Sequence, residues 1–178
     1  MGRILMSWLA LVIWAAPGVA AANAPLELDW LDLLPAEDRA AMERVPEAMA
    51  ELNEKLLAQG MDRLTPEVEM PAVLSSTAVR PELDGTRVRL PGFLVPLEVN
   101  ERGDAVTFFL VPYFGACIHV PPPPPNQMVF VSFPGGIPAD AIWDPYWVVG
   151  PLRIETTSND LGIATYAIEA ENISLYDG

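Results

Sequence analysis

The side chains of this sequence that are best suited to chemistry lie within residues 115–127. Cys117 is the only cysteine of the chain and His119 is the only histidine, with one residue between them. In an extended segment, side chains two positions apart point to the same face, so the thiol and the imidazole would lie side by side. Together they could bind a divalent metal ion such as zinc, or the imidazole could lower the pKa of the thiol.

A purely structural role is the alternative for this pair. Free cysteines are commonly buried and unreactive, and a lone histidine can be a hydrogen-bonded part of a stiff turn. In an exported protein, however, a single cysteine cannot form an internal disulfide, which favours an intermolecular bond, a metal ligand or a reactive thiol. One cysteine and one histidine cannot supply the four ligands of a structural zinc site, so a metal would need carboxylates or a second chain as well.

Five consecutive prolines and two side-chain amides follow the Cys-x-His pair. Prolines have a fixed φ and no backbone N–H, which predicts a polyproline rod of about 15 Å that cannot pair as a central strand. The amides can satisfy unpaired carbonyl groups or hold a ligand. We therefore expect a rigid connection with anchored ends. The binding and structural motif predicted around it comprises Tyr113, Gly115, Pro121, Pro122, Pro123, Pro124, Pro125, Asn126 and Gln127.

The first 22 residues have the pattern of a secretory signal peptide. A short basic start containing Arg3 precedes an apolar run from Ile4 to Ala16, and small residues suited to cleavage follow Pro17 and Gly18. The apolar run is too short to span a membrane comfortably, because a spanning helix needs about 20 residues. We expect a cleaved signal, a periplasmic mature protein and no stable membrane insertion afterwards.

The charge of the chain limits its partners. It has 24 acidic and 10 basic residues, a formal net charge of −14. A surface this acidic should repel nucleic acids and anionic membranes. Cationic partners and metal ions are compatible with it, although solubility alone also explains the charge.

The pattern of apolar residues predicts two structural parts. Residues 23–72 form a helical N-terminal segment with a linker, in which the helical pattern over 36–59 breaks at Pro46 and ends at Gly60. The acidic residues of these helices, Asp38 and Glu43 among them, are interpreted as a solvated face. In residues 73–178 the pattern predicts five strands, at 87–99, 105–114, 128–133, 146–156 and 162–175, with a helical turn at 138–143.

Two of these strands contain a Pro-Gly or Gly-Pro pair, at Pro91-Gly92 and at Gly150-Pro151. Such pairs bend strands and allow a short sheet to close. The chain is therefore predicted to be mainly β with an N-terminal helical segment, its strands forming a five-stranded OB-like Greek-key barrel. A small β-sandwich is the alternative.

No catalytic motif stands out. The nucleophile elbow, H-E-x-x-H, P-loop and dinucleotide fingerprints are all missing from the sequence. This favours a protein that is not an enzyme, and no catalytic residue is predicted. A thiol-based enzyme or redox partner, with Cys117 as nucleophile and His119 as base, stays open as an alternative.

The stretch from Val111 to Gln127 resembles a bacterial family of exported domains of unknown function, marked by the motif G-A-C-I-H-x-P-P-P-P-x-N-Q. Further matches over residues 75–175 include Leu83-Asp84-Gly85, Leu90-Pro91-Gly92-Phe93 and Trp147-Val148-Val149-Gly150. Relatives in that family are periplasmic and sometimes accompany ABC-type transport components and zinc-responsive genes. The resemblance implies an accessory protein in metal homeostasis or envelope transport.

These observations lead to three hypotheses of function. In the first, the protein is a non-catalytic periplasmic binding protein in which Cys117 and His119 bind zinc, with an envelope ABC-type transport component as partner. In the second, it is the thiol-based enzyme or redox partner described above. In the third, it is an interaction scaffold whose proline connection docks on an aromatic-lined groove of a partner.

Overall fold

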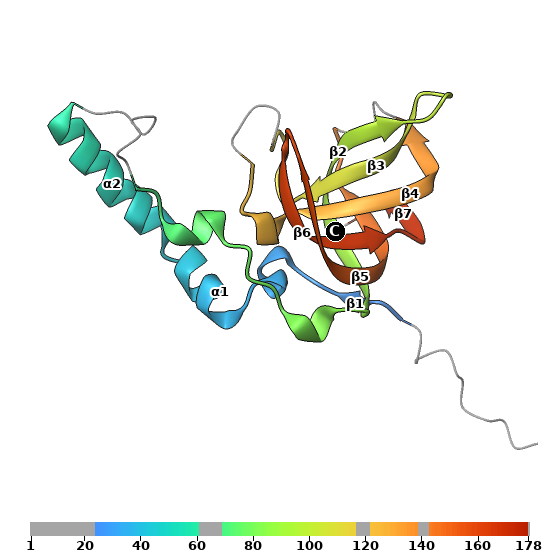
Figure 1. Cartoon of the computed structure of the whole chain (residues 1–178), viewed down its shortest axis with the longest axis horizontal. Helices are drawn as coiled ribbons and strands as arrows, with labels where there is room; N and C mark the ends of the chain where they lie inside the picture. Colours follow the sequence, from blue (N-terminus) through green and yellow to red (C-terminus); the bar gives the residue numbers. More distant parts are fainter. Residues whose placement is uncertain (1–23, 61–68, 117–121, 139–142, 178) are drawn as a thin grey trace, which may run out of the picture.

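The computed structural model describes residues 24–60, 69–116, 122–138 and 143–177 (Figure 1). The predicted signal peptide, Cys117, His119 and Pro121 lie outside these ranges, as does most of the helical turn predicted at 138–143. Within the described part of the chain, no helix is long and apolar enough to cross a membrane.

The N-terminal part contains the two predicted helices. Helix α1 spans Ala36–Met42 and helix α2 spans Val45–Gln59, with Pro46 in the first turn of α2. Gly60 ends α2 in the left-handed conformation, with φ of 64°, which glycine adopts at no steric cost. Both helices project to one side of the sheet in Figure 1. The prediction of two helices broken near Pro46 and stopped at Gly60 is thus confirmed.

The rest of the described chain is mainly β. Short 3₁₀ helices connect the strands: η2 (Trp30–Leu33), η3 (Ala72–Ser75), η4 (Pro81–Leu83) and η5 (Pro125–Gln127). Seven strands form the sheet in the order β1-β2-β3-β4-β6-β5-β7. Their bounds are β1 Leu26–Glu27, β2 Arg87–Val99, β3 Asp104–Val111, β4 Val129–Pro138, β5 Tyr146–Asn159, β6 Gly162–Glu169 and β7 Asn172–Leu175.

The sheet thus has seven strands where the sequence predicted five. The two-residue strand β1 was not predicted, and the segment predicted as one strand over 162–175 is divided into β6 and β7. The division has a clear cause, because the N–H of Ala170 bonds to Ser132 and the N–H of Glu171 bonds to Val149, on two different strands. The predicted end of β4 at residues 134–136 is also wrong, since β4 continues to Pro138, which pairs with Asp104.

Five of the strands pair in a closed series. Strand β2 pairs with β3, β3 with β4, β4 with β6, β6 with β5, and β5 again with β2. The β4–β6 pairing is parallel and the other four are antiparallel. The side chains inside this series form most of the main core, together with Leu28, Trp30 and Leu33 from the N-terminal segment.

Both glycines of the Pro-Gly pairs lie where a strand changes its neighbour. At Gly92, β2 ends its pairing with β5 and begins its pairing with β3. Around Gly150, the pairing of β5 with β7 ends at Val149, its pairing with β2 ends at Pro151, and its pairing with β6 begins at Leu152. A Cβ on Gly92 would lie 2.7 Å from the carbonyl oxygen of Val111. Only glycine permits backbones to approach this closely.

We expect Gly150→Ala to destabilise the fold. The added Cβ would lie 2.3 Å from the carbonyl oxygen of Glu169, so β5 and β6 must separate, at a cost of about 3 kcal/mol. Chemical denaturation measures this free energy of unfolding. The exposed variant Ser174→Ala on β7 is the control, expected to change stability by less than about 0.5 kcal/mol; equal stabilities of the two variants would contradict the close approach at Gly150.

Candidate functional site

The candidate site is the connection between β3 and β4, residues 112–128, called here the proline connection. At its entrance, Tyr113 and Phe114 are exposed, Gly115 has φ of 82° and Ala116 is fully buried. Cys117, the first predicted metal ligand, comes directly after the buried alanine in the sequence and lies outside the described residues, as does His119.

The exit of the proline connection differs in part from the predicted rod. Pro123 and Pro124 are buried, and Pro124 has the extended polyproline conformation, with φ of −51° and ψ of 148°. Pro125, however, begins η5, because the backbone N–H of Gln127 donates to the carbonyl of Pro124 at 2.8 Å. A proline fits the first position of a helix, where no N–H is needed. The predicted polyproline conformation therefore ends one residue early.

Asn126 and Gln127, called here the amide pair, are buried and bond to distant parts of the chain. The Nδ2 of Asn126 donates to the carbonyl of Ala78 at 3.0 Å, and the Nε2 of Gln127 donates to the carbonyl of Trp30 at 2.6 Å. The backbone N–H of Asn126 also donates to Ser76 at 3.3 Å. The expected anchoring of the exit by side-chain amides on backbone carbonyls is observed.

Asp38 of α1 adds a charged acceptor to this exit. Its Oδ2 accepts from the hydroxyl of Ser76 at 2.5 Å and from Nδ2 of Asn126 at 2.7 Å. The interpretation of Asp38 as part of a solvated helical face is therefore wrong. The other polar atom of the Asn126 side chain, Oδ1, is buried and has no hydrogen-bond partner among the described residues.

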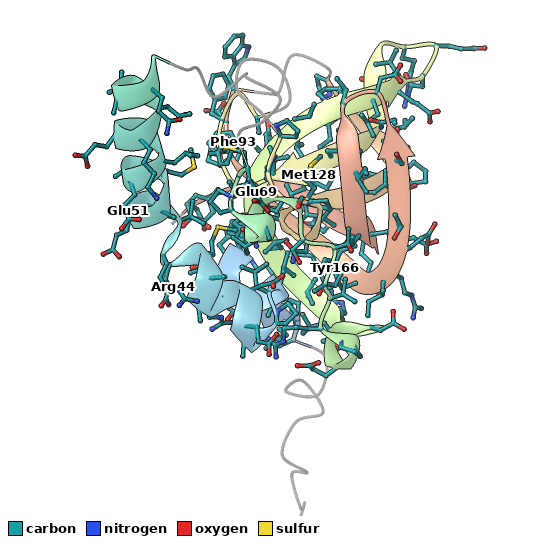
Figure 2. All side chains as sticks on the ribbon, turned by 60° about the vertical axis from the view of Figure 1, so that its left-hand side comes forward. Arg44, Glu51, Glu69, Phe93, Met128 and Tyr166 are labelled. Carbon is teal, nitrogen blue, oxygen red and sulfur yellow. The ribbon has the colours of Figure 1, made fainter. Side chains whose placement is uncertain are left out.

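An aromatic patch lies at the entrance of the proline connection. It consists of Phe93, Phe114 and Trp143; Phe93 is labelled in Figure 2. The ring centroids of Phe93 and Phe114 are 5.8 Å apart, and those of Phe114 and Trp143 are 5.5 Å apart. Trp143 is 66% exposed and Phe114 is 45% exposed. Exposed aromatic side chains in contact with one another are typical of interaction surfaces.

No metal site is visible among the described residues. Within the ranges that exclude Cys117 and His119, no three His, Cys, Asp or Glu side chains come together in a way that could hold a metal ion.

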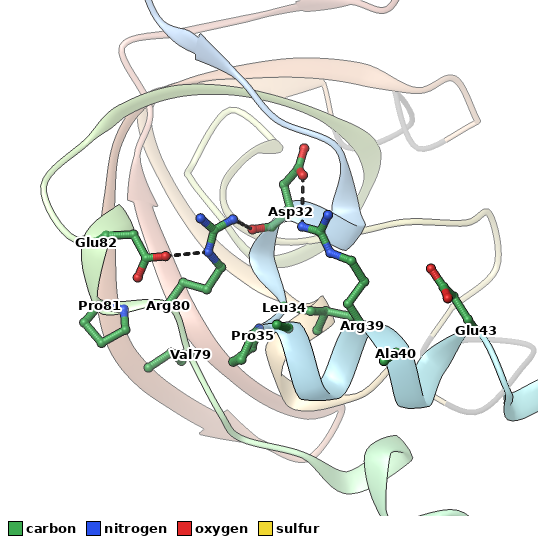
Figure 3. Close-up of a pocket in the computed structure, with 11 residues that line it drawn as sticks. Asp32, Leu34, Pro35, Arg39, Ala40, Glu43, Val79, Arg80, Pro81 and Glu82 are labelled. Atoms are coloured by element: carbon green, nitrogen blue, oxygen red, sulfur yellow. Dashed lines mark hydrogen bonds and ion pairs between the residues drawn. The ribbon is translucent and has the colours of Figure 1, made fainter.

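A second feature, which the sequence did not predict, is a cleft between α1 and the segment before η4 (Figure 3). We call it the arginine cleft; its volume is about 660 Å³. Arg39 and Arg80 point into it, and both bond to Asp32. The sequence contains no signal for this cleft, because Arg39 and Arg80 are far apart in the chain and only the fold brings both of them to Asp32.

We expect removal of the amide pair's bonds to destabilise the protein. Gln127→Ala strands the buried carbonyl of Trp30. Asn126→Ala removes the part-buried bonds to the carbonyl of Ala78 and to Asp38. Each loss should cost about 1–3 kcal/mol, the range for an unsatisfied buried polar group. Chemical denaturation measures it, with the exposed amide variant Gln59→Ala as control. A stability equal to that of the control would show that these bonds do not hold the exit.

Comparison with known proteins gives the family of the chain. The family described as "Protein of unknown function (DUF3299)" matches residues 30–175. A crystal structure of a DUF3299 family protein from Pseudomonas aeruginosa PAO1 is similar, with 34% sequence identity and a TM-score of 0.64, over 88% of this chain and 99% of that chain. No curated protein matches the chain. Because the family match covers most of the sequence, this chain belongs to the DUF3299 family.

Proposed function

We propose that this protein is an exported, periplasmic binding protein without catalytic activity, and that Cys117 and His119 bind a divalent metal ion, zinc in the first instance. The observation that carries the proposal is the burial of both described ends of the proline connection. Ala116 is fully buried on one side, and the amide pair is buried and bonded on the other. Ligands placed between two fixed ends lose little conformational entropy when they bind a metal.

The proposed cellular role is an accessory function in metal homeostasis or envelope transport, next to an ABC-type transport component. The acidic charge of −14 is compatible with a metal-binding role and disfavours nucleic acid as a partner.

We further propose that strands β2 to β6 form an OB-like barrel. The closed pairing series and the single parallel pairing between β4 and β6 support this. The proline connection then joins the second and third strands of that barrel. Barrels of this kind carry their binding sites on loops and on one sheet face, which agrees with a site at this connection.

An interaction scaffold is the second candidate, and the aromatic patch favours it. Phe114 and Trp143 of this patch are exposed and lie at the entrance of the same connection, so a protein partner could contact both the patch and the connection. This function requires no metal.

Zinc titration of the purified mature chain tests the metal proposal. Isothermal calorimetry should give saturable binding that weakens at least about tenfold in the Cys117→Ala, His119→Ala double variant, since both ligands are lost; about 1.4 kcal/mol corresponds to that factor. The control is the double variant Glu47→Gln, Glu51→Gln at exposed positions of α2. It makes the surface less negative but keeps Cys117 and His119. An unchanged affinity in the double variant would rule out the proposed ligands.

The thiol-based alternative predicts a different result. If His119 activates Cys117 as a nucleophile, the pKa of the thiol lies well below the ordinary value of about 8.5. The rate of alkylation of the metal-free protein, measured against pH, reports this pKa. In the His119→Gln variant the midpoint should return toward the ordinary value. A wild-type curve like that of free cysteine would exclude the enzyme hypothesis.

A further inference from the structure

The arginine cleft contains two guanidinium groups that are held in place before any ligand binds. In Arg39, Nη2 donates to Oδ1 of Asp32 at 3.1 Å. The other carboxylate oxygen of Asp32 accepts from the backbone N–H of Asp29 at 2.9 Å. Because both of its oxygens are bonded, Asp32 has a fixed orientation, and it fixes Arg39.

Arg80 is fixed from the other side of the cleft. Its Nη1 donates to the carbonyl of Asp32 at 2.6 Å, and its Nε donates to Glu82 at 2.9 Å. Its backbone N–H donates to the hydroxyl of Tyr166 at 2.7 Å, and that hydroxyl donates to the carbonyl of Leu33 at 2.8 Å. Burial raises the pKa of Tyr166, so this hydroxyl keeps its proton at neutral pH. One buried tyrosine thus joins the two walls of the cleft.

Both guanidinium groups keep N–H donors for a ligand. Among the described residues, no partner bonds to Nε or Nη1 of Arg39 or to Nη2 of Arg80. Figure 3 shows the two groups on either side of Asp32. Guanidinium groups bind carboxylates through paired, charge-assisted hydrogen bonds. The cleft therefore has a place for the carboxylate of a ligand.

The other charges of the cleft determine what else the ligand must carry. Asp32 and Glu82 already pair with the arginines, while the carboxylate of Glu43 has no ion pair in the described part of the chain. Three carboxylates against two guanidinium groups would disfavour a simple anion such as phosphate. An ammonium group near Glu43 would balance the charge. The remaining wall is apolar and includes Leu34, Pro35 and Val79.

We propose that the arginine cleft binds a zwitterion of the size of a dipeptide. Its carboxylate lies between Arg39 and Arg80, its ammonium lies toward Glu43, and its side chains lie on Pro35 and Val79. The volume of about 660 Å³ is within the range of about 300–1,000 Å³ for small-molecule sites. This proposal does not involve Cys117 or His119.

Three probes test the proposal by titration of the ¹⁵N-labelled mature chain. Leucyl-leucine carries both charges, leucyl-leucinamide lacks the carboxylate and N-acetyl-leucyl-leucine lacks the ammonium. Leucyl-leucine should shift the amide resonances of residues 32–43 and 79–82 saturably, and each analogue should bind about tenfold more weakly, a factor equal to about 1.4 kcal/mol. Equal binding of the three probes, binding elsewhere, or no saturable shift would overturn the proposal.

Substitutions of Arg39 and Glu43 assign the charges. Arg39→Gln should weaken leucyl-leucine about tenfold and leave leucyl-leucinamide unchanged, because that probe has no carboxylate. Glu43→Gln should weaken leucyl-leucine and leave N-acetyl-leucyl-leucine unchanged. Arg102→Gln, which alters an ion pair with Asp104 elsewhere on the surface, is the control and should bind like the wild type. If either variant loses the binding of all three probes while its melting temperature is unchanged, the assignment is contradicted.

Discussion

The bonds of the amide pair are the constraint on which the arrangement of this protein depends. Gln127 and Asn126 hold the carbonyls of Trp30 and Ala78, which are 97 and 48 residues away in the chain. If a buried amide lost such partners, the protein would be less stable, because no other bond would replace the lost ones. The N-terminal segment, the segment before η4 and the exit of the proline connection are therefore fixed together by two side chains that carry no charge.

A charged residue and a hydroxyl extend this constraint to the arginine cleft. Asp38 bonds to Asn126 from α1, the helix that also carries Arg39. Tyr166 of β6 bonds to both cleft walls through Leu33 and Arg80. The cleft and the exit of the proline connection are thus both bonded to side chains of α1, through Arg39 and Asp38 respectively.

The sequence predicted local features well and distant contacts poorly. The bounds of β2 follow from the pattern of apolar residues, and the end of α2 follows from the conformational freedom of Gly60; both signals lie within a few neighbouring residues. Strand β1 has only two residues, too few for a pattern, and the division between β6 and β7 depends on acceptors in other strands. Asp38 has the sequence context of an ordinary exposed helical acid, and only the fold brings it to Asn126. Cys117 and His119 stay predictions, since they lie outside the described residues.

Charge explains why the two proposed sites can coexist on one acidic chain. Most arginines of the described part are already paired with carboxylates, as in Arg87 with Glu171 and Arg102 with Asp104. The surface is left with excess negative charge, which attracts divalent cations and disfavours anions over the whole molecule. In the arginine cleft, two fixed guanidinium groups face the same space and keep free N–H donors. The negative potential of the whole protein opposes the binding of a carboxylate there unless the same ligand also carries an ammonium group. The acidity that is compatible with the proposed metal site therefore favours zwitterions in the cleft.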